Sequence, residues 1–314
     1  MRRRATESGP HRLRIAHDSL PCGSITVRRA HLRRGRPVSS VVPESERAPV
    51  GVDPTRASIA RVYDAFLGGK DNYEIDRQVR DRVLQVAPEA ADMAVENRHF
   101  LIRACRFLAH SAGVTQFLDC GSGLPTAENV HQVVQRINPE ATVVYVDNDP
   151  VVANHGKALL EDNDTTHFIS ADIYKPDEVL GHEVVRKHID FSQPVAFLQV
   201  GTLHHFVGDA QGPAKVMRNY VDALASGSYV TVSHFFDPEN ELSEVARKME
   251  EQFTHSPMGS GSFRTQAELD QLTEGLDLLD PGWELCAQWW PDGPQIDPLS
   301  VGQRCIAGAL GRKP

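Results

Sequence analysis

The chain has few cysteines for its length and lacks any long apolar run. Its five cysteines are scattered over 314 residues without a Cys-x-x-Cys pair, a distribution typical of free thiols in a reducing cytoplasm. No apolar run approaches the roughly 20 residues that a membrane-spanning helix needs. No apolar core follows the first arginines, so the sequence does not predict a secretory signal. We therefore expect a cytoplasmic protein without a membrane span.

Signatures of several common sites are also missing. The fourteen histidines are dispersed, with neither a His-x-x-x-His pair nor a Cys/His cluster, so no metal site is predicted. The sequence contains no Walker pattern of a P-loop and no Gly-x-Ser-x-Gly elbow of a hydrolase. Candidate site residues are therefore sought among glycines, acids and single histidines.

Positive charge is concentrated at one end of the chain. Residues 1–48 hold eleven arginines and four acids, a net charge of +7, so a total of −9 leaves −16 for the remaining residues. Residues 1–52 are rich in Arg, Ser, Pro and Gly without periodicity, which predicts a disordered arm; an electrostatic tether to an acidic partner is the alternative. The acidic body makes nucleic acid an unexpected partner and favours a small or cationic one.

The rest of the chain divides into two predicted parts. Apolar residues at helical spacing over 53–112 predict three helices, which we interpret as a helical lid. From 113 to 314, strand and helix patterns alternate as in a doubly wound α/β sheet. Strands are predicted near 114–119, 141–147, 165–170, 194–201 and 227–234, helices near 126–138, 150–161, 176–189, 212–226, 239–254 and 264–274, and a late antiparallel pair near 276–290 and 302–310.

A glycine turn follows the first predicted strand. The strand ends in Asp119, and Gly121 and Gly123 come next, where glycines let the backbone approach a ligand closely. A dinucleotide fold needs a third glycine and free amides, but Pro125 and Thr126 stand there. Asp119 would repel a diphosphate, so the turn favours a ligand that carries positive charge.

Acids also end the next two predicted strands. Asp147 stands where such folds place a ribose-binding acid. Asp149, two residues later, could also bind the ribose, but it precedes a proline and is typical of a helix N-cap. Asp172 ends the third strand and could accept a hydrogen bond from an adenine amino group, with Ile173 against the ring.

These motifs resemble, in order, those of class I S-adenosylmethionine-dependent methyltransferases. Further stretches resemble one bacterial family of S-adenosyl methyltransferases long catalogued as a domain of unknown function, over about residues 53–312. The resemblance implies a Rossmann-like sheet of order 3-2-1-4-5-7-6 with an antiparallel last strand, and S-adenosylmethionine as cofactor. The motifs are Phe117–Gly123, Tyr145–Pro150, Ala171–Ile173 and Phe197–Phe206, with Ala60–Asp64, Leu67–Asn72 and Glu96–Arg98 in the lid; Asp119, Gly121, Gly123, Asp147, Asn148, Asp172 and Ile173 would hold the cofactor.

Two lid residues could add to the cofactor site. Arg98 could pair with the methionine carboxylate through two parallel hydrogen bonds, or form an ordinary salt bridge on the helix surface. Gly69 could contact the amino-acid end of the cofactor, or serve only to end a helix and form a turn.

Candidates for proton transfer follow the fourth predicted strand. His204 and His205 stand at its carboxyl end, and histidine can take a proton near neutral pH. The alternative is that each is a hydrogen-bonded structural imidazole or part of the adenine wall, and the same holds for His234. Tyr63 and Tyr73 are candidates to line the acceptor pocket.

The sequence therefore predicts a methyltransferase with an unidentified small-molecule acceptor. A cofactor-binding regulatory protein without catalysis is an alternative, because methyl transfer has no obligatory catalytic residue. A nicotinamide-dependent oxidoreductase is a weaker one, because the glycine turn does not fit a dinucleotide. The oligomeric state is not predicted.

Overall fold

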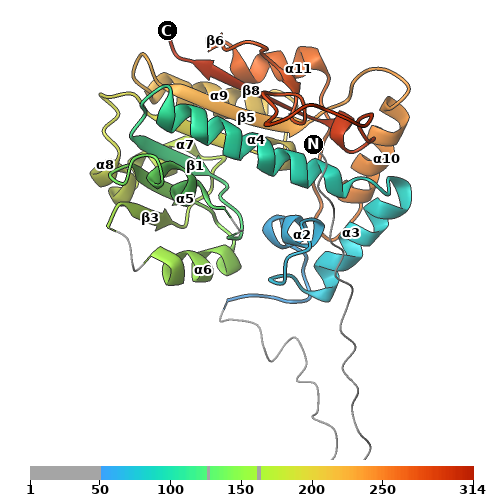
Figure 1. Cartoon of the computed structure of the whole chain (residues 1–314). Coiled ribbons are helices and arrows are strands. Elements are labelled where there is room, and N and C mark those ends of the chain that lie inside the picture. The colour runs from blue at the N-terminus through green and yellow to red at the C-terminus, as the bar shows by residue number, and fades with distance from the viewer. Residues whose placement is uncertain (1–50, 126–127, 161–163) are drawn as a thin grey trace, which may run out of the picture. The chain divides into compact units, whose positions relative to one another are not determined.

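Figure 1 shows the computed structural model of the chain, which describes residues 51–125, 128–160 and 164–314. The described residues form one mixed sheet of eight strands. The predicted arm over residues 1–52 lies almost wholly outside the described ranges. The strands are β1 Gln116–Cys120, β2 Thr142–Val146, β3 Thr166–Ile169, β4 Ala196–Val200, β5 Tyr229–Phe235, β6 Asp277–Leu278, β7 Glu284–Leu285 and β8 Ile306–Arg312.

The strand order confirms the predicted topology. The sheet runs β3-β2-β1-β4-β5-β8-β6, with β7 as a second short partner of β8. Strands β1 to β5 are parallel, whereas the last strand, β8, inserts antiparallel beside β5. The first late run forms two strands of two residues, so the inserted strand is the eighth rather than the seventh.

Helices cover both faces of the sheet. Phe117 and Leu118 are successive residues of β1, so their side chains point to opposite faces, and each is fully buried in a different apolar cluster. Helices α4 and α5 contribute to the first cluster, and α7, α8, α9 and α11 to the second. The helices are α2 Ile59–Phe66, α3 Glu74–Val86, α4 Ala91–His110, α5 Val130–Gln135, α6 Pro150–Leu160, α7 Pro176–Gly181, α8 Glu183–His188, α9 Gly212–Ala223, α10 Ser243–Thr254 and α11 Gln266–Asp270.

The predicted helix over 176–189 is two helices. His182 adopts an extended backbone conformation, with φ −63° and ψ 135°, which separates α7 from α8. Its imidazole nitrogen accepts a hydrogen bond from the backbone N–H of Val184 at 3.2 Å, so the side chain caps the second helix. Histidine is not a usual N-cap residue, which explains why the pattern gave one continuous helix.

The start of α2 is tied to α3 by a buried ion pair. The Nε of Arg61 lies 3.0 Å from Oδ2 of Asp76, and both side chains are almost fully buried. The other carboxylate oxygen of Asp76 accepts from the backbone N–H of Ser58 at 3.0 Å, directly before α2. Removing either charge would leave the other buried without its partner.

A second carboxylate holds the connection between α2 and α3. Oδ2 of Asp64 accepts from the backbone N–H of Asp71 at 3.0 Å and from Nδ2 of Asn72 at 2.7 Å. A Cβ on Gly69 would lie 1.9 Å from Oδ1 of Asp64, so only glycine allows this loop to close on the carboxylate. The loop is therefore built around Asp64.

The predicted lid over 53–112 is not uniform in its packing. Helix α4 lies along the sheet and contacts β4, β5 and β8, whereas α3 contacts α10 and α2 contacts α3 and α4. No helix in the described part of the chain is long and apolar enough to cross a membrane.

Candidate functional site

A cleft of about 440 Å³ lies at the carboxyl ends of the parallel strands. Residues that follow β1, β2 and β4 form its floor, and residues of α2 and α4 line the other side. The sheet order changes direction between β1 and β4, and ligands of open α/β sheets bind at such a point. The position of the cleft thus follows from the topology.

The glycine turn forms part of this floor, as predicted. Gly121 and Gly123 have φ of +84° and +65°, which favour glycine. A Cβ on Gly121 would lie 2.3 Å from the Cγ2 of Thr202, so a larger residue would displace the wall. The backbone N–H of Gly121 donates to the carbonyl of Val146 at 2.7 Å, which holds the turn against β2.

Asp147 links β2 to the glycine turn. Its Oδ2 accepts from the backbone N–H of Gly123 at 2.9 Å, and its Oδ1 accepts from the N–H of Asp149 at 2.9 Å. Burial raises the pKa of Asp147 to about 6, although these hydrogen bonds oppose the shift. Asn148 also lines the cleft. Asp149 accepts from the N–H of Val151 at 2.7 Å, which confirms its predicted role as a helix cap.

Asp119 lines the cleft at the end of β1 and is only 5% exposed. Burial raises its pKa to about 7, the nearby guanidinium of Arg98 lowers it, and the carboxylate of Asp147 raises it further. A cation in the cleft would stabilise the ionised form of this carboxylate.

Two polar atoms of the cleft wall are buried and lack hydrogen-bond partners among the described residues. Arg98 donates from Nη2 to the carbonyl of Glu128, but its Nε is unpartnered. The Oγ1 of Thr202 is unpartnered as well. Buried polar groups are normally paired, so this wall fits a ligand with polar groups that can bond to both atoms.

Most of the predicted cofactor residues meet in the cleft. Asp172 and Gly69 are not among its lining residues. Asp172 accepts from the backbone N–H of Tyr174 at 3.0 Å and lies 3.4 Å from the Nζ of Lys175. Gly69 belongs to the loop around Asp64. The lining residues that the sequence predicted are Asp119, Gly121, Gly123, Asp147, Asn148, Ile173, Arg98, Tyr63 and His205.

The three candidate histidines are all buried, and burial lowers their pKa values. The pKa falls well below its ordinary value for His204, to about 4 for His205 and to about 3 for His234. Nδ1 of His205 lies 3.2 Å from Oγ of Ser260. At neutral pH all three rings are therefore uncharged.

His234 is a hydrogen-bonded structural imidazole, the alternative to proton transfer given in the sequence analysis. Its Nδ1 lies 2.7 Å from the carbonyl oxygen of Phe235, to which it donates, and its Nε2 accepts from Nη1 of Arg264 at 3.0 Å. Both ring nitrogens are thus used within the fold, and His234 is not among the residues that line the cleft.

Several lining residues carried no clear sequence signal. Met258 lies in the loop after α10, where no periodicity marks it. Tyr174 follows Ile173 and donates from its hydroxyl to the carbonyl of Thr202 at 2.9 Å, so the motif of the third strand could have included it. Tyr73, a predicted pocket residue, is not among the residues that line the cleft, and the guanidinium of Arg61 lies 5.0 Å from the centre of its ring.

A sheet of this order, with acids at the carboxyl ends of β1 and β2 lining one cleft, is that of the Rossmann-like methyltransferase class. The chain belongs to the S-adenosyl methyltransferase family, whose model matches residues 45–314. This match confirms the resemblance seen in the sequence, and with it the predicted cofactor, S-adenosylmethionine.

Solved structures agree with this assignment. A predicted methyltransferase from Thermobifida fusca YX is 42% identical, with a TM-score of 0.80 over 87% of this chain and 99% of that one. A DUF574 family protein from Streptomyces avermitilis MA-4680 is 34% identical, with a TM-score of 0.78 over 83% of this chain and 99% of that one. No curated protein matches the chain significantly.

Proposed function

We propose that this methyltransferase binds S-adenosylmethionine in the cleft and transfers its methyl group to a small-molecule acceptor. The observation that supports the proposal best is the convergence of Asp119, Arg98 and Asp147 on one cleft beside the glycine turn. Their charges complement a ligand that carries an ammonium, a carboxylate and ribose hydroxyls.

Each residue would have a separate role. Asp147 would accept hydrogen bonds from the ribose hydroxyls, since each of its oxygens has lone pairs beyond the one used by a backbone N–H. Asp119 would face the ammonium group, and the unpartnered Nε of Arg98 would donate to the carboxylate. Ile173 would pack against the adenine ring.

When bound, S-adenosylmethionine supplies a methyl group on a sulfonium that already contains the leaving group. The protein therefore has mainly to align the acceptor and to exclude water. We propose that α2 and α3 act as the lid for this purpose, because α2 lines the cleft opposite the sheet. His205, uncharged at neutral pH, could accept a proton from the acceptor.

Calorimetric titration of the purified protein with S-adenosylmethionine, S-adenosylhomocysteine and NADH tests the proposal. We expect the first two to bind with micromolar affinity and NADH not to bind. Absence of binding by the first two would contradict the proposed site. Binding without turnover over a broad panel of acceptors would favour a regulatory protein instead.

Asp147→Ala is expected to weaken cofactor binding by about 1–3 kcal/mol, the range for lost hydrogen bonds to a charged group. Calorimetry on the folded variant measures the change. Asp172→Ala is the matched variant, since Asp172 follows the adjacent strand β3 but lies outside the cleft lining. An unchanged cofactor affinity in Asp147→Ala would show that the ribose acid is misassigned. A lower cofactor affinity in Asp172→Ala would support the predicted contact of Asp172 with the adenine.

A further inference from the structure

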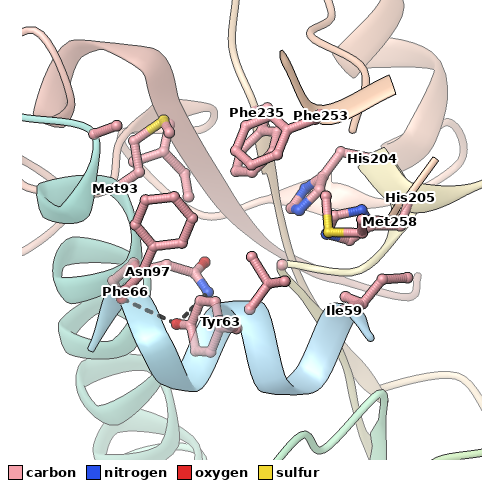
Figure 2. A pocket seen from close by; sticks show the side chains of 15 residues that line it. Ile59, Tyr63, Phe66, Met93, Asn97, His204, His205, Phe235, Phe253 and Met258 are labelled. Carbon is pink, nitrogen blue, oxygen red and sulfur yellow. Dashed lines mark hydrogen bonds between the residues drawn. The ribbon is translucent and has the colours of Figure 1, made fainter. Parts of the chain in front are cut away.

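A second, apolar compartment adjoins the cofactor cleft. The two share a wall that includes Tyr63, Asn97 and His205. Figure 2 shows this compartment between α2, α4 and the segment that carries His204 and His205. Its lining comes from α2, from α4 and the residue before it, and on the opposite side from β5, β8, α10 with the loop after it, and the segment that follows β4.

No Asp, Glu, Lys or Arg is present among the described residues that line the compartment. Its histidines are uncharged, because burial lowers the pKa of both His204 and His205. A charged ligand group would lose its hydration here without gaining an opposite charge, which costs much more than the transfer of an uncharged group. The lining therefore selects an uncharged group, and the cationic acceptor that the acidic composition favoured does not fit it.

Tyr63 and Asn97, the polar side chains that α2 and α4 contribute to this lining, are already hydrogen-bonded within the fold. The hydroxyl of Tyr63 donates to the carbonyl of Ala94 at 3.0 Å and accepts from Nδ2 of Asn97 at 3.1 Å. Oδ1 of Asn97 in turn accepts from the hydroxyl of Ser233 in β5. These bonds fix the shared wall, so Tyr63 has no hydroxyl proton left to give to a ligand.

One polar atom of the lining remains unused. His204 is 3% exposed, and its Nδ1 is buried without a hydrogen-bond partner among the described residues. An uncharged imidazole can accept or donate one hydrogen bond at such a nitrogen. A buried atom of this kind is normally paired, so its partner is to be sought in a ligand.

Flat rings form the wall behind His204. The imidazole stacks on the ring of Phe235 at 3.6 Å and 12°, and Phe235 stacks on Phe253 at 5.4 Å and 20°. Phe66 extends the same group of rings, with its centre 6.2 Å from that of Phe253. Aromatic side chains of this kind, with the thioethers of Met93 and Met258 in the same lining, pack well against another aromatic group.

We propose that this compartment holds the methyl acceptor, and that the acceptor is an uncharged, mainly apolar molecule with an aromatic ring and one group that hydrogen-bonds to His204. This inference rests on the proposed function for the adjoining cleft. The free space in the compartment is about 30 Å³, enough for a water-sized group. Only a small group of the acceptor fits this space as it stands, so the ring would lie partly in the adjoining cleft, whose free volume is about 440 Å³.

Three probes of similar shape test the charge selection. Benzyl alcohol, benzoate and benzylamine are titrated at pH 7.5 into the full-length protein, with and without saturating S-adenosylhomocysteine, and affinities are measured by ligand-detected NMR. Benzyl alcohol is expected to bind at least about tenfold more tightly than benzoate or the benzylammonium cation. Equal or tighter binding of either ion would overturn the proposal.

Phe66→Glu supplies the decisive variant. Phe66 is partly buried and lines the compartment but not the cofactor cleft. The new carboxylate is expected to reverse the preference from benzyl alcohol to benzylammonium and to leave the affinity for S-adenosylhomocysteine unchanged, which also shows that the variant is folded. Ile137→Glu is the control, because Ile137 is 38% exposed and lines neither site.

The two proposals fail in different ways. Loss of the probe preference with intact S-adenosylhomocysteine binding would contradict only the acceptor compartment. Absence of S-adenosylhomocysteine binding by the unmodified protein would contradict the cofactor site, while the probe titrations without it still decide the charge selection. An unchanged probe preference in Phe66→Glu would place the acceptor elsewhere.

Discussion

Replacement of Asp119 by asparagine is expected to weaken the binding of S-adenosylmethionine at pH 7.5 by about 10- to 150-fold. The estimate corresponds to the loss of a charged hydrogen bond of about 1.5–3 kcal/mol. Asparagine has nearly the same shape and keeps one acceptor oxygen, so the fold is expected to be retained. The negative charge of Asp119 also interacts favourably with the positive charge of Arg98 nearby, and the asparagine variant lacks this interaction.

The pH dependence of binding provides a second measurement on the same residue. The pKa of Asp119 in the free protein is raised to about 7, so the carboxyl is mostly protonated at pH 5.5 and mostly ionised at pH 7.5. A bound ammonium favours the ionised form, so binding releases a proton and the affinity rises with pH over this interval. Below pH 7 the change is up to about tenfold per pH unit.

Comparison of two ligands identifies the group that Asp119 faces. S-adenosylhomocysteine keeps the ammonium but lacks the sulfonium charge, so Asp119→Asn is expected to weaken both ligands equally and to flatten the pH dependence of both. Asp177→Asn, an exposed position on α7, serves as the control. A loss limited to S-adenosylmethionine would place the sulfonium, rather than the ammonium, beside this carboxylate.

Asp76→Ala is expected to lower the free energy of unfolding by about 3–5 kcal/mol, the cost of breaking a buried ion pair by removing one partner. Arg61 would stay buried without its counter-charge, and the backbone N–H of Ser58 would lose its acceptor. Urea unfolding measures the loss, with the slope of the transition showing whether the compactness of either state has changed.

Two further variants make that result specific. Asp81→Ala breaks an exposed pair with Arg80 on the same helix, and is expected to cost about 0–1 kcal/mol. The double variant Arg61→Met, Asp76→Leu removes both charges and is expected to recover most of the stability, because packed apolar residues can replace a buried ion pair. A loss for Asp76→Ala no greater than that for Asp81→Ala would show that the pair is not buried in solution.

Local pattern was enough to predict the sheet and the floor of the cleft. Each parallel strand is a short apolar run, and the positive φ of Gly121 and Gly123 lies where two glycines interrupt the pattern. Asp119 and Asp147 follow from the same logic, because a residue that ends a parallel strand reaches the edge of the sheet where such folds bind ligands. These features depend only on neighbours in sequence.

The opposite wall could not be predicted in this way. Asn97 reaches Ser233 across 136 positions of the chain, and Phe66 of α2 lines one compartment with Met258 of the loop after α10. Gly69 and Asp172 show the converse, since each fits a ligand-binding pattern but is used by its own loop, around Asp64 and Lys175. A local motif does not show whether a polar group has already found its partner within the fold.

The two carboxylates that hold α2 also limit how the cleft can open. Asp76 secures the beginning of α2, and Asp64 closes its connection to α3, so α2 cannot separate alone. In the proposed lid, residues 59–86 would therefore move as one cooperative unit, with α3 sliding or lifting from α10. Amide protons of both helices would then exchange with a common opening free energy, and the α3–α10 contact would contribute to the barrier to opening.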